Sequence, residues 1–103
     1  NSNMKKVLGI TDAQLSSFCR RHHIRKLSVF GSILTDRFNP SSDIDVLVEF
    51  EPGIRMGLIK MAGIERELSS MTGKKIDMRT KSDLSRYFRD EVVSESEVQY
   101  AEG

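Results

Sequence analysis

The sequence lacks most features that mark secreted, membrane-spanning or repetitive proteins. It has a single cysteine, Cys19, which excludes an internal disulfide framework. No apolar run approaches the roughly 18 residues of a transmembrane helix, and no signal-peptide pattern is present. Internal repeats and low-complexity tracts are also missing. These absences favour an ordinary globular chain with one compact core.

Charge of one sign is not in excess either. The 16 Lys and Arg residues nearly balance the 15 Asp and Glu residues, which gives a formal net charge of +1. This balance provides no global case for binding nucleic acid or a membrane surface. At 103 residues the chain is long enough to bury a core without staples, so we expect a single domain over residues 4–103. Residues 1–3 are expected to be a tag remnant before a natural Met4.

The chemically informative stretch contains two apolar runs with the composition of strands, residues 27–30 and 44–50. The first run ends in Gly31-Ser32, where backbone N–H groups at the start of a helix could bind an anion. The second run has Asp43 and Asp45 at its head. Carboxylates at the start of a strand are costly unless a cation meets them, so the pair calls for a chemical explanation.

The spacing of Asp43 and Asp45 supplies that explanation. Residues i and i+2 project from one face of a strand, about 6.6 Å apart, so both carboxylates can converge on one divalent ion. Mg²⁺ commonly uses one or two carboxylates together with substrate phosphates. A third carboxylate, Asp77, lies in another alternating segment. Phosphate donors on one side and metal ligands on the other predict metal-assisted phosphoryl or nucleotidyl transfer, in which Asp77 adds a second ion or acts as general base.

Each of these residues also has a purely structural interpretation. Asp43 could cap a turn, Asp45 could be a solvated edge residue, and Ser32 could simply cap a short helix. Arg37 could reach a phosphate or remain solvated. The combination of Gly-Ser, the paired carboxylates and a third carboxylate favours the functional interpretation, since no single part of it is specific.

Periodicity predicts the surrounding elements. Helices are expected at Thr11–His23, Ile54–Met71 and Leu84–Glu97, with a short helix from Gly31-Ser32 to about Arg37. Strands are expected at Lys26–Phe30, Ile44–Glu49 and Lys74–Arg79. A capping box of Thr11 and Gln14 begins the first helix, and Gly73 ends the second. Phe88 and Val92 are expected in the core, although they could instead dock a partner together with Tyr100. Residues 98–103 are assigned no structure.

The sequence resembles the minimal nucleotidyltransferase (MNT) family of the polymerase-β-type superfamily. The resemblance rests on Gly31-Ser32, on Ser42-Asp-Ile-Asp-Val-Leu-Val-Glu-Phe50 and on Lys75-Ile76-Asp77, and it extends from Leu15 to about Tyr100. It implies an α/β (α+β) fold in which helices flank a small mixed β-sheet, with Mg²⁺ as cofactor and ATP as substrate. By the same resemblance the phosphates are held by Gly31 and Ser32, and the catalytic metal ligands are Asp43, Asp45 and Asp77.

One segment departs from the family pattern. After Gly-Ser the family often shows x-Ala-Arg-Gly, whereas this chain reads Ile33-Leu34-Thr35-Asp36-Arg37. Thr35 cannot replace an arginine that contacts the triphosphate. Arg37 is therefore the candidate for that nucleotide-binding role.

Members of this length resemble the antitoxin half of prokaryotic, cytoplasmic toxin–antitoxin pairs. The implied partner is a HEPN-domain ribonuclease toxin encoded beside them, and the implied reaction transfers AMP from ATP to a tyrosine hydroxyl of that toxin. No membrane and no direct nucleic-acid partner is implied. The alternative is a non-catalytic antitoxin that inhibits the toxin by binding it. A free-standing enzyme acting on a small molecule or RNA is disfavoured, because the chain shows neither an acceptor domain nor a strongly basic face.

Overall fold

The computed structural model describes residues 7–34 and 43–102, with Ser32 and Ile33 described by their backbone alone. The expected tag remnant at residues 1–3 lies outside these ranges, and so do Arg37 and the loop through Pro40. No helix in the described part is long and apolar enough to cross a bilayer.

A four-stranded mixed sheet organises the fold. Its strands are β1 (Ile24–Phe30), β2 (Ile44–Phe50), β3 (Ile76–Arg79) and β4 (Glu97–Ala101), in the order β3-β2-β1-β4. Strand β1 runs antiparallel to both β2 and β4, whereas β2 and β3 are parallel. The helical elements are α1 (Asp12–Arg21), α2 (Leu58–Thr72), α3 (Arg89–Glu95) and the 3₁₀ turns η1 (Gly31–Leu34) and η2 (Lys81–Asp83). The predicted fold class, a small mixed sheet flanked by helices, is confirmed.

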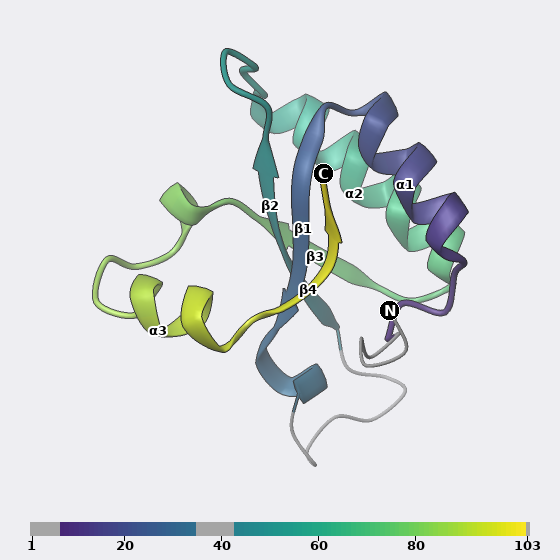
Figure 1. The fold of residues 1–103 in the computed structure, drawn as a ribbon. Helices are drawn as coiled ribbons and strands as arrows, with labels where there is room; N and C mark the ends of the chain where they lie inside the picture. The colour runs from purple at the N-terminus through teal and green to yellow at the C-terminus, as the bar shows by residue number, and fades with distance from the viewer. Residues whose placement is uncertain (1–6, 35–42, 103) are drawn as a thin grey trace.

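Helices α1 and α2 lie together on one side of the sheet, while α3 lies apart from them on the other (Figure 1). The core fills the space between this helical pair and the sheet, and its members include Phe18, Leu68, Ile44, Val46 and Val48. Because alternate residues of a strand face opposite sides, burying these three β2 residues turns Asp45 and Leu47 to the other face. Leu47 is only 4% exposed, so that face is not polar throughout.

Helix α1 begins with the predicted capping box. The Gln14 backbone N–H donates to the Thr11 hydroxyl (3.0 Å), and the Thr11 N–H donates to Oε1 of Gln14 (2.9 Å). At the other end the basic residues do more than offset the helix dipole. Nη1 of Arg21 lies 2.6 Å from Oε2 of Glu67, and Nε2 of His22 lies 2.9 Å from Oε1 of the same carboxylate. Glu67 therefore ties the end of α1 to the middle of α2.

Replacing Glu67 with glutamine is expected to lower the unfolding free energy by about 0.5–1 kcal/mol at neutral pH. Burial raises the pKa of Glu67, but the hydrogen bonds and charges of Arg21 and His22 outweigh it and hold this pKa below its ordinary value. A lowered folded-state pKa stabilises the protein above the unfolded pKa, and the contribution is lost as the pH falls through the folded pKa. Urea unfolding of both proteins should thus differ at pH 7 and converge in acid. The exposed Glu91→Gln change is the control, and a constant difference at every pH would contradict the prediction.

The second helix starts later than the predicted residue, Ile54. It begins at Leu58 with Gly57 as N-cap, because the chain turns at Gly53 (φ +85°) and residues 54–57 are not helical. Leu58, the first residue of the helix, is 88% exposed. Further along, Ile64 and Leu68 are buried, and Gly73 ends the helix in the left-handed conformation (φ 69°) as predicted.

The C-terminal region differs most from the prediction. In place of one helix over Leu84–Glu97, the chain after η2 forms a turn and then the seven-residue α3. The segment expected to be unstructured is β4, which pairs with the edge of β1 through Val29↔Glu97 and Leu27↔Tyr100. The expected core role of Phe88 was also wrong, since that side chain is 60% exposed. Val92 is half-buried and lies outside the core cluster.

Candidate active site

Two of the three predicted carboxylates lie directly opposite each other. The parallel register of β2 and β3 pairs Ile44 with Ile76 and Asp45 with Asp77. Adjacent strands are about 4.8 Å apart, so the side chains of paired residues are neighbours on one face. Ile44 and Ile76 both point into the core, which places Asp45 and Asp77 on the face away from α1 and α2.

The outer two carboxylates have cationic partners. Oδ2 of Asp43 lies 3.9 Å from Nζ of Lys75, and Oδ2 of Asp77 lies 3.2 Å from Nη2 of Arg79. Such exposed pairs contribute little stability, so they can exchange for a stronger cation. Within residues 7–34 and 43–102, no three acidic, histidine or cysteine side chains are arranged closely enough to hold a metal ion. The roles of the three aspartates as metal ligands therefore stay a prediction.

The pKa of Asp45 is raised by its position in this site. Burial raises its pKa, Asp77 and Asp43 raise it further, and Arg79 alone opposes them. The three carboxylates thus interact, and their combined negative charge is only partly neutralised by the nearby cations. A hard divalent cation such as Mg²⁺ suits this set of oxygen donors, because it would relieve the repulsion and prefers oxygen ligands.

Gly31 lies against Asp45 at the end of β1. The register pairs Phe30 with Asp45, and the chain then turns into η1 with Gly31 at φ +79°. A Cβ atom built on Gly31 would overlap Oδ2 of Asp45, so this contact requires glycine for space as well as for backbone conformation. The structure thus brings Gly31, the backbone of Ser32 and the carboxylates to one end of the sheet. It does not describe Arg37.

A pocket of about 490 Å³ opens beside this glycine. One wall comes from β1 and η1 through Phe30, Gly31 and Leu34, and the other comes from Val92, Glu95 and Glu97. Sequence reasoning missed the second wall. Nothing local identifies it, because Glu97 reaches the site only through its pairing with Val29 across β1 and β4.

A mixed sheet that presents paired aspartates beside a glycine turn fits a nucleotidyl-transfer domain. This chain belongs to the nucleotidyltransferase domain family, which matches residues 12–99. Among its relatives is a Methanocaldococcus jannaschii protein with a provisional protein adenylyltransferase name, 30% identical over 76 residues, or 74% of this chain and 80% of the relative. The protein adenylyltransferase MntA of Thermococcus cleftensis is 28% identical over 92 residues, or 89% and 91% of the two chains.

Solved structures share the fold. A provisionally described minimal nucleotidyltransferase superimposes with a TM-score of 0.67 at 29% identity, covering 82% of this chain and 85% of its own. The MNT antitoxin complex with a tri-AMPylated HEPN toxin from Shewanella oneidensis gives a TM-score of 0.59 at 16% identity, with 87% and 69% coverage. The predicted family is confirmed by these findings.

Proposed function

We propose that this nucleotidyltransferase moves AMP from ATP to a hydroxyl group, that of a tyrosine on a HEPN-domain toxin, and thereby acts as the antitoxin. The observation that carries the proposal is the juxtaposition of Asp45 and Asp77 across β2 and β3 with Gly31 against them. The names of the relatives support the acceptor class. They describe protein adenylyltransferases, and one structural neighbour is a complex of an MNT antitoxin with an AMPylated HEPN toxin.

Some residues of this chain would bind the metal and the phosphates, and one would accept a proton. The carboxylates of Asp43, Asp45 and Asp77 would hold Mg²⁺, which when bound supplies positive charge for the triphosphate. Backbone N–H groups at Gly31 and Ser32 would bind the phosphates. The acceptor oxygen then bonds to the α-phosphorus, and pyrophosphate leaves as that bond forms. Asp77, on the strand at the edge of the sheet, would take the hydroxyl proton.

The pocket beside Gly31 offers a place for the nucleoside. Phe30, Leu34 and Val92 provide an apolar lining for a base, and the carboxylate of Glu97 can accept hydrogen bonds from ribose hydroxyls. The pocket adjoins the glycine that contacts Asp45, so a nucleoside there would keep its phosphates near the carboxylates. With the nucleoside in the pocket and its phosphates near the carboxylates, the acceptor hydroxyl would approach from the exposed side of Asp77.

Incubation of the chain with Mg²⁺, ATP and the HEPN-domain protein encoded beside it is the direct test. We expect the acceptor mass to rise by one AMP unit or a multiple of it, and label from α-³²P-ATP but not γ-³²P-ATP to remain on the protein. Retention of the γ label would indicate a kinase instead. Neutralisation of the toxin without any mass change, and equally by an Asp43→Asn variant, would indicate the non-catalytic antitoxin.

A further inference from the structure

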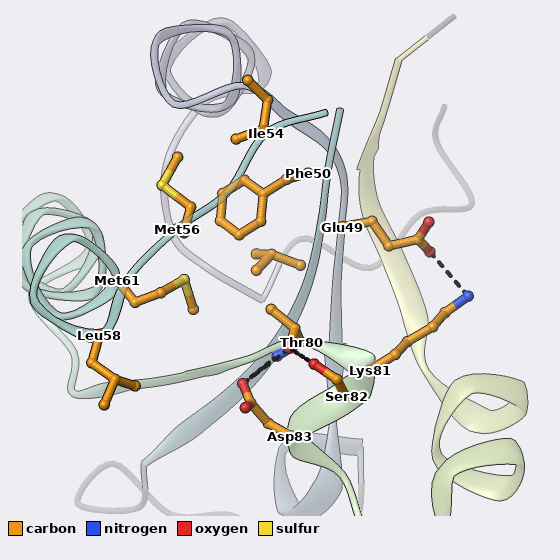
Figure 2. A pocket seen from close by; sticks show the side chains of 11 residues that line it. Glu49, Phe50, Ile54, Met56, Leu58, Met61, Thr80, Lys81, Ser82 and Asp83 are labelled. Carbon is orange, nitrogen blue, oxygen red and sulfur yellow. Dashed lines mark hydrogen bonds and ion pairs between the residues drawn. The ribbon is translucent and has the colours of Figure 1, made fainter. Parts of the chain in front are cut away.

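A second pocket lies at the opposite end of β2 from the carboxylates. It has a volume of about 530 Å³ and lies between the end of β2, the start of α2 and η2 (Figure 2). Phe50, Met56 and Met61 form its apolar side, and residues 80–83 form its polar side. The pocket residues nearest the carboxylates along the chain, Val48 and Thr80, follow Asp45 and Asp77 by three positions, about 10 Å along the strands. The lining includes none of the three aspartates, so this pocket is distinct from the candidate active site.

An unpartnered apolar pair borders this pocket. Leu58 and Ile59 are 88% and 89% exposed, although each is a large aliphatic residue in the first turn of a well-formed helix. Leu58 lines the pocket and Ile59 follows it in the chain. Single exposed aliphatic residues are ordinary, but two adjacent ones next to a pocket with an apolar side indicate an interaction surface. We call the pocket together with Leu58 and Ile59 the α2 docking surface.

The charges around this surface indicate what it would bind. The first turn of α2 has no acidic residue and Gly57 supplies no side-chain cap, so the positive end of the helix dipole is uncompensated there. Arg55 and Lys60 flank the aliphatic pair, and neither forms an ion pair within the described ranges.

The acidic residues of the pocket are already occupied. Oε2 of Glu49 lies 3.5 Å from Nζ of Lys81 across the polar side. Oδ2 of Asp83 accepts hydrogen bonds from the backbone N–H and the hydroxyl of Thr80, each 3.0 Å long (Figure 2). The donors to Asp83 are neutral, so its negative charge remains, whereas the charges of Glu49 and Lys81 offset each other. Arg55 and Lys60 together exceed the one charge of Asp83, so the balance at this surface is positive.

We propose that the α2 docking surface binds an acidic, amphipathic segment of the protein that accepts AMP. Apolar side chains of that segment would enter the pocket between Met56 and Met61, and its carboxylates would meet Arg55, Lys60 and the N-terminus of α2. The proposal rests on the proposed function for the identity of the partner. It assigns recognition of the partner to a surface remote from the transfer chemistry, so binding and catalysis can be separated by mutation.

The test measures binding without transfer. The HEPN-domain protein encoded beside this chain is titrated calorimetrically against an Asp45→Asn background, with and without the double change Leu58→Asp and Ile59→Asp. Acidic residues are favourable in the first turn of a helix, so the double variant is expected to keep the melting temperature of its background. It should raise the dissociation constant at least about 30-fold, because it removes two apolar contacts and repels acidic groups.

Two controls separate this proposal from its alternatives. Tyr87→Ser alters an equally prominent exposed side chain (79%) on the segment before α3 and should leave the dissociation constant unchanged. With active protein, Leu58→Asp should raise the KM for the acceptor and leave kcat at saturating acceptor within about twofold, since the carboxylates are untouched.

Several outcomes would overturn the docking proposal. Unchanged affinity in the double variant, loss of affinity in Tyr87→Ser, or no complex with the HEPN-domain protein would do so. A wild-type dimer that the double variant dissociates would assign the surface to a second copy of this chain. If the variant abolishes binding while the wild-type protein transfers no AMP, the proposed function fails and the docking surface remains.

Discussion

Asp45→Asn is expected to lower the rate of AMP transfer at least about 10³-fold while leaving the protein folded. Asp45 is the middle carboxylate of the three, since it pairs with Asp77 in the register and its pKa responds to both Asp77 and Asp43. Removing its charge would remove metal stabilisation of the developing charge, which amounts to several kcal/mol, and each 1.36 kcal/mol is a factor of ten in rate.

The same substitution should not destabilise the protein without metal. Burial and the neighbouring carboxylates raise the pKa of Asp45 above its ordinary value. A raised pKa favours folding below the unfolded pKa, and this contribution is lost as the pH rises through the folded pKa. At neutral pH the ionised side chain therefore opposes folding, and an uncharged asparagine relieves that repulsion. We expect the melting temperature of Asp45→Asn in EDTA to equal or exceed that of the wild type at pH 7.

Thermal unfolding with and without Mg²⁺ and ATP tests whether Asp45→Asn loses transfer because it binds these ligands poorly and not because it is unfolded. Wild-type protein should gain stability from the added ligands, because they bind the folded state, whereas Asp45→Asn should gain much less. Asp90→Asn, the same chemical change at a position on α3, is the matched control and should retain both transfer and ligand stabilisation. Transfer by Asp45→Asn within about threefold of the wild type would contradict the assignment of this carboxylate, since the loss expected is of order 10³.

The half of the sheet that carries the carboxylates could be predicted because its signals are local. Alternation in β2 and β3 assigns Val46 and Met78 to the core, and it therefore assigns Asp45 and Asp77 to the opposite face. The pairing between these strands is not local. The resemblance to a family is what predicted that Gly31, the paired aspartates and the third aspartate lie together in one site.

The chain after β3 could not be predicted from such signals. Val98 and Tyr100 alternate with polar residues over too short a length to indicate a strand, and β4 forms because the edge of β1, some 70 residues earlier, offers unpaired backbone groups. The start of α2 at Leu58, four residues after the predicted one, was missed for a related reason. Apolar residues at helical spacing indicate which face of a helix could be buried. They do not indicate where the helix begins, which here follows the turn at Gly53. Both misses are cases in which tertiary geometry overrides local pattern.

Gly31→Ala is expected to have the second large effect, through both stability and catalysis. A left-handed conformation (φ +79°) costs a residue with a Cβ atom about 1–2 kcal/mol. In addition, the new Cβ would overlap Oδ2 of Asp45 and force that carboxylate to move. Displacing a reacting or ligating group by about 1 Å can cost about 100-fold in rate, so we expect a loss of transfer of at least this size.

Gly53→Ala separates the two contributions of Gly31→Ala. Gly53 has nearly the same backbone angle (φ +85°), but among the described residues no atom beyond its two chain neighbours lies within 4 Å of the position that a Cβ atom would take there. Both variants should therefore lose about 1–2 kcal/mol of unfolding free energy from backbone strain alone, with a further loss in Gly31→Ala from the overlap. Only Gly31→Ala should lose AMP transfer, measured well below both melting temperatures. Equal transfer by the two variants would show that the contact between Gly31 and Asp45 does not position the carboxylate for the reaction.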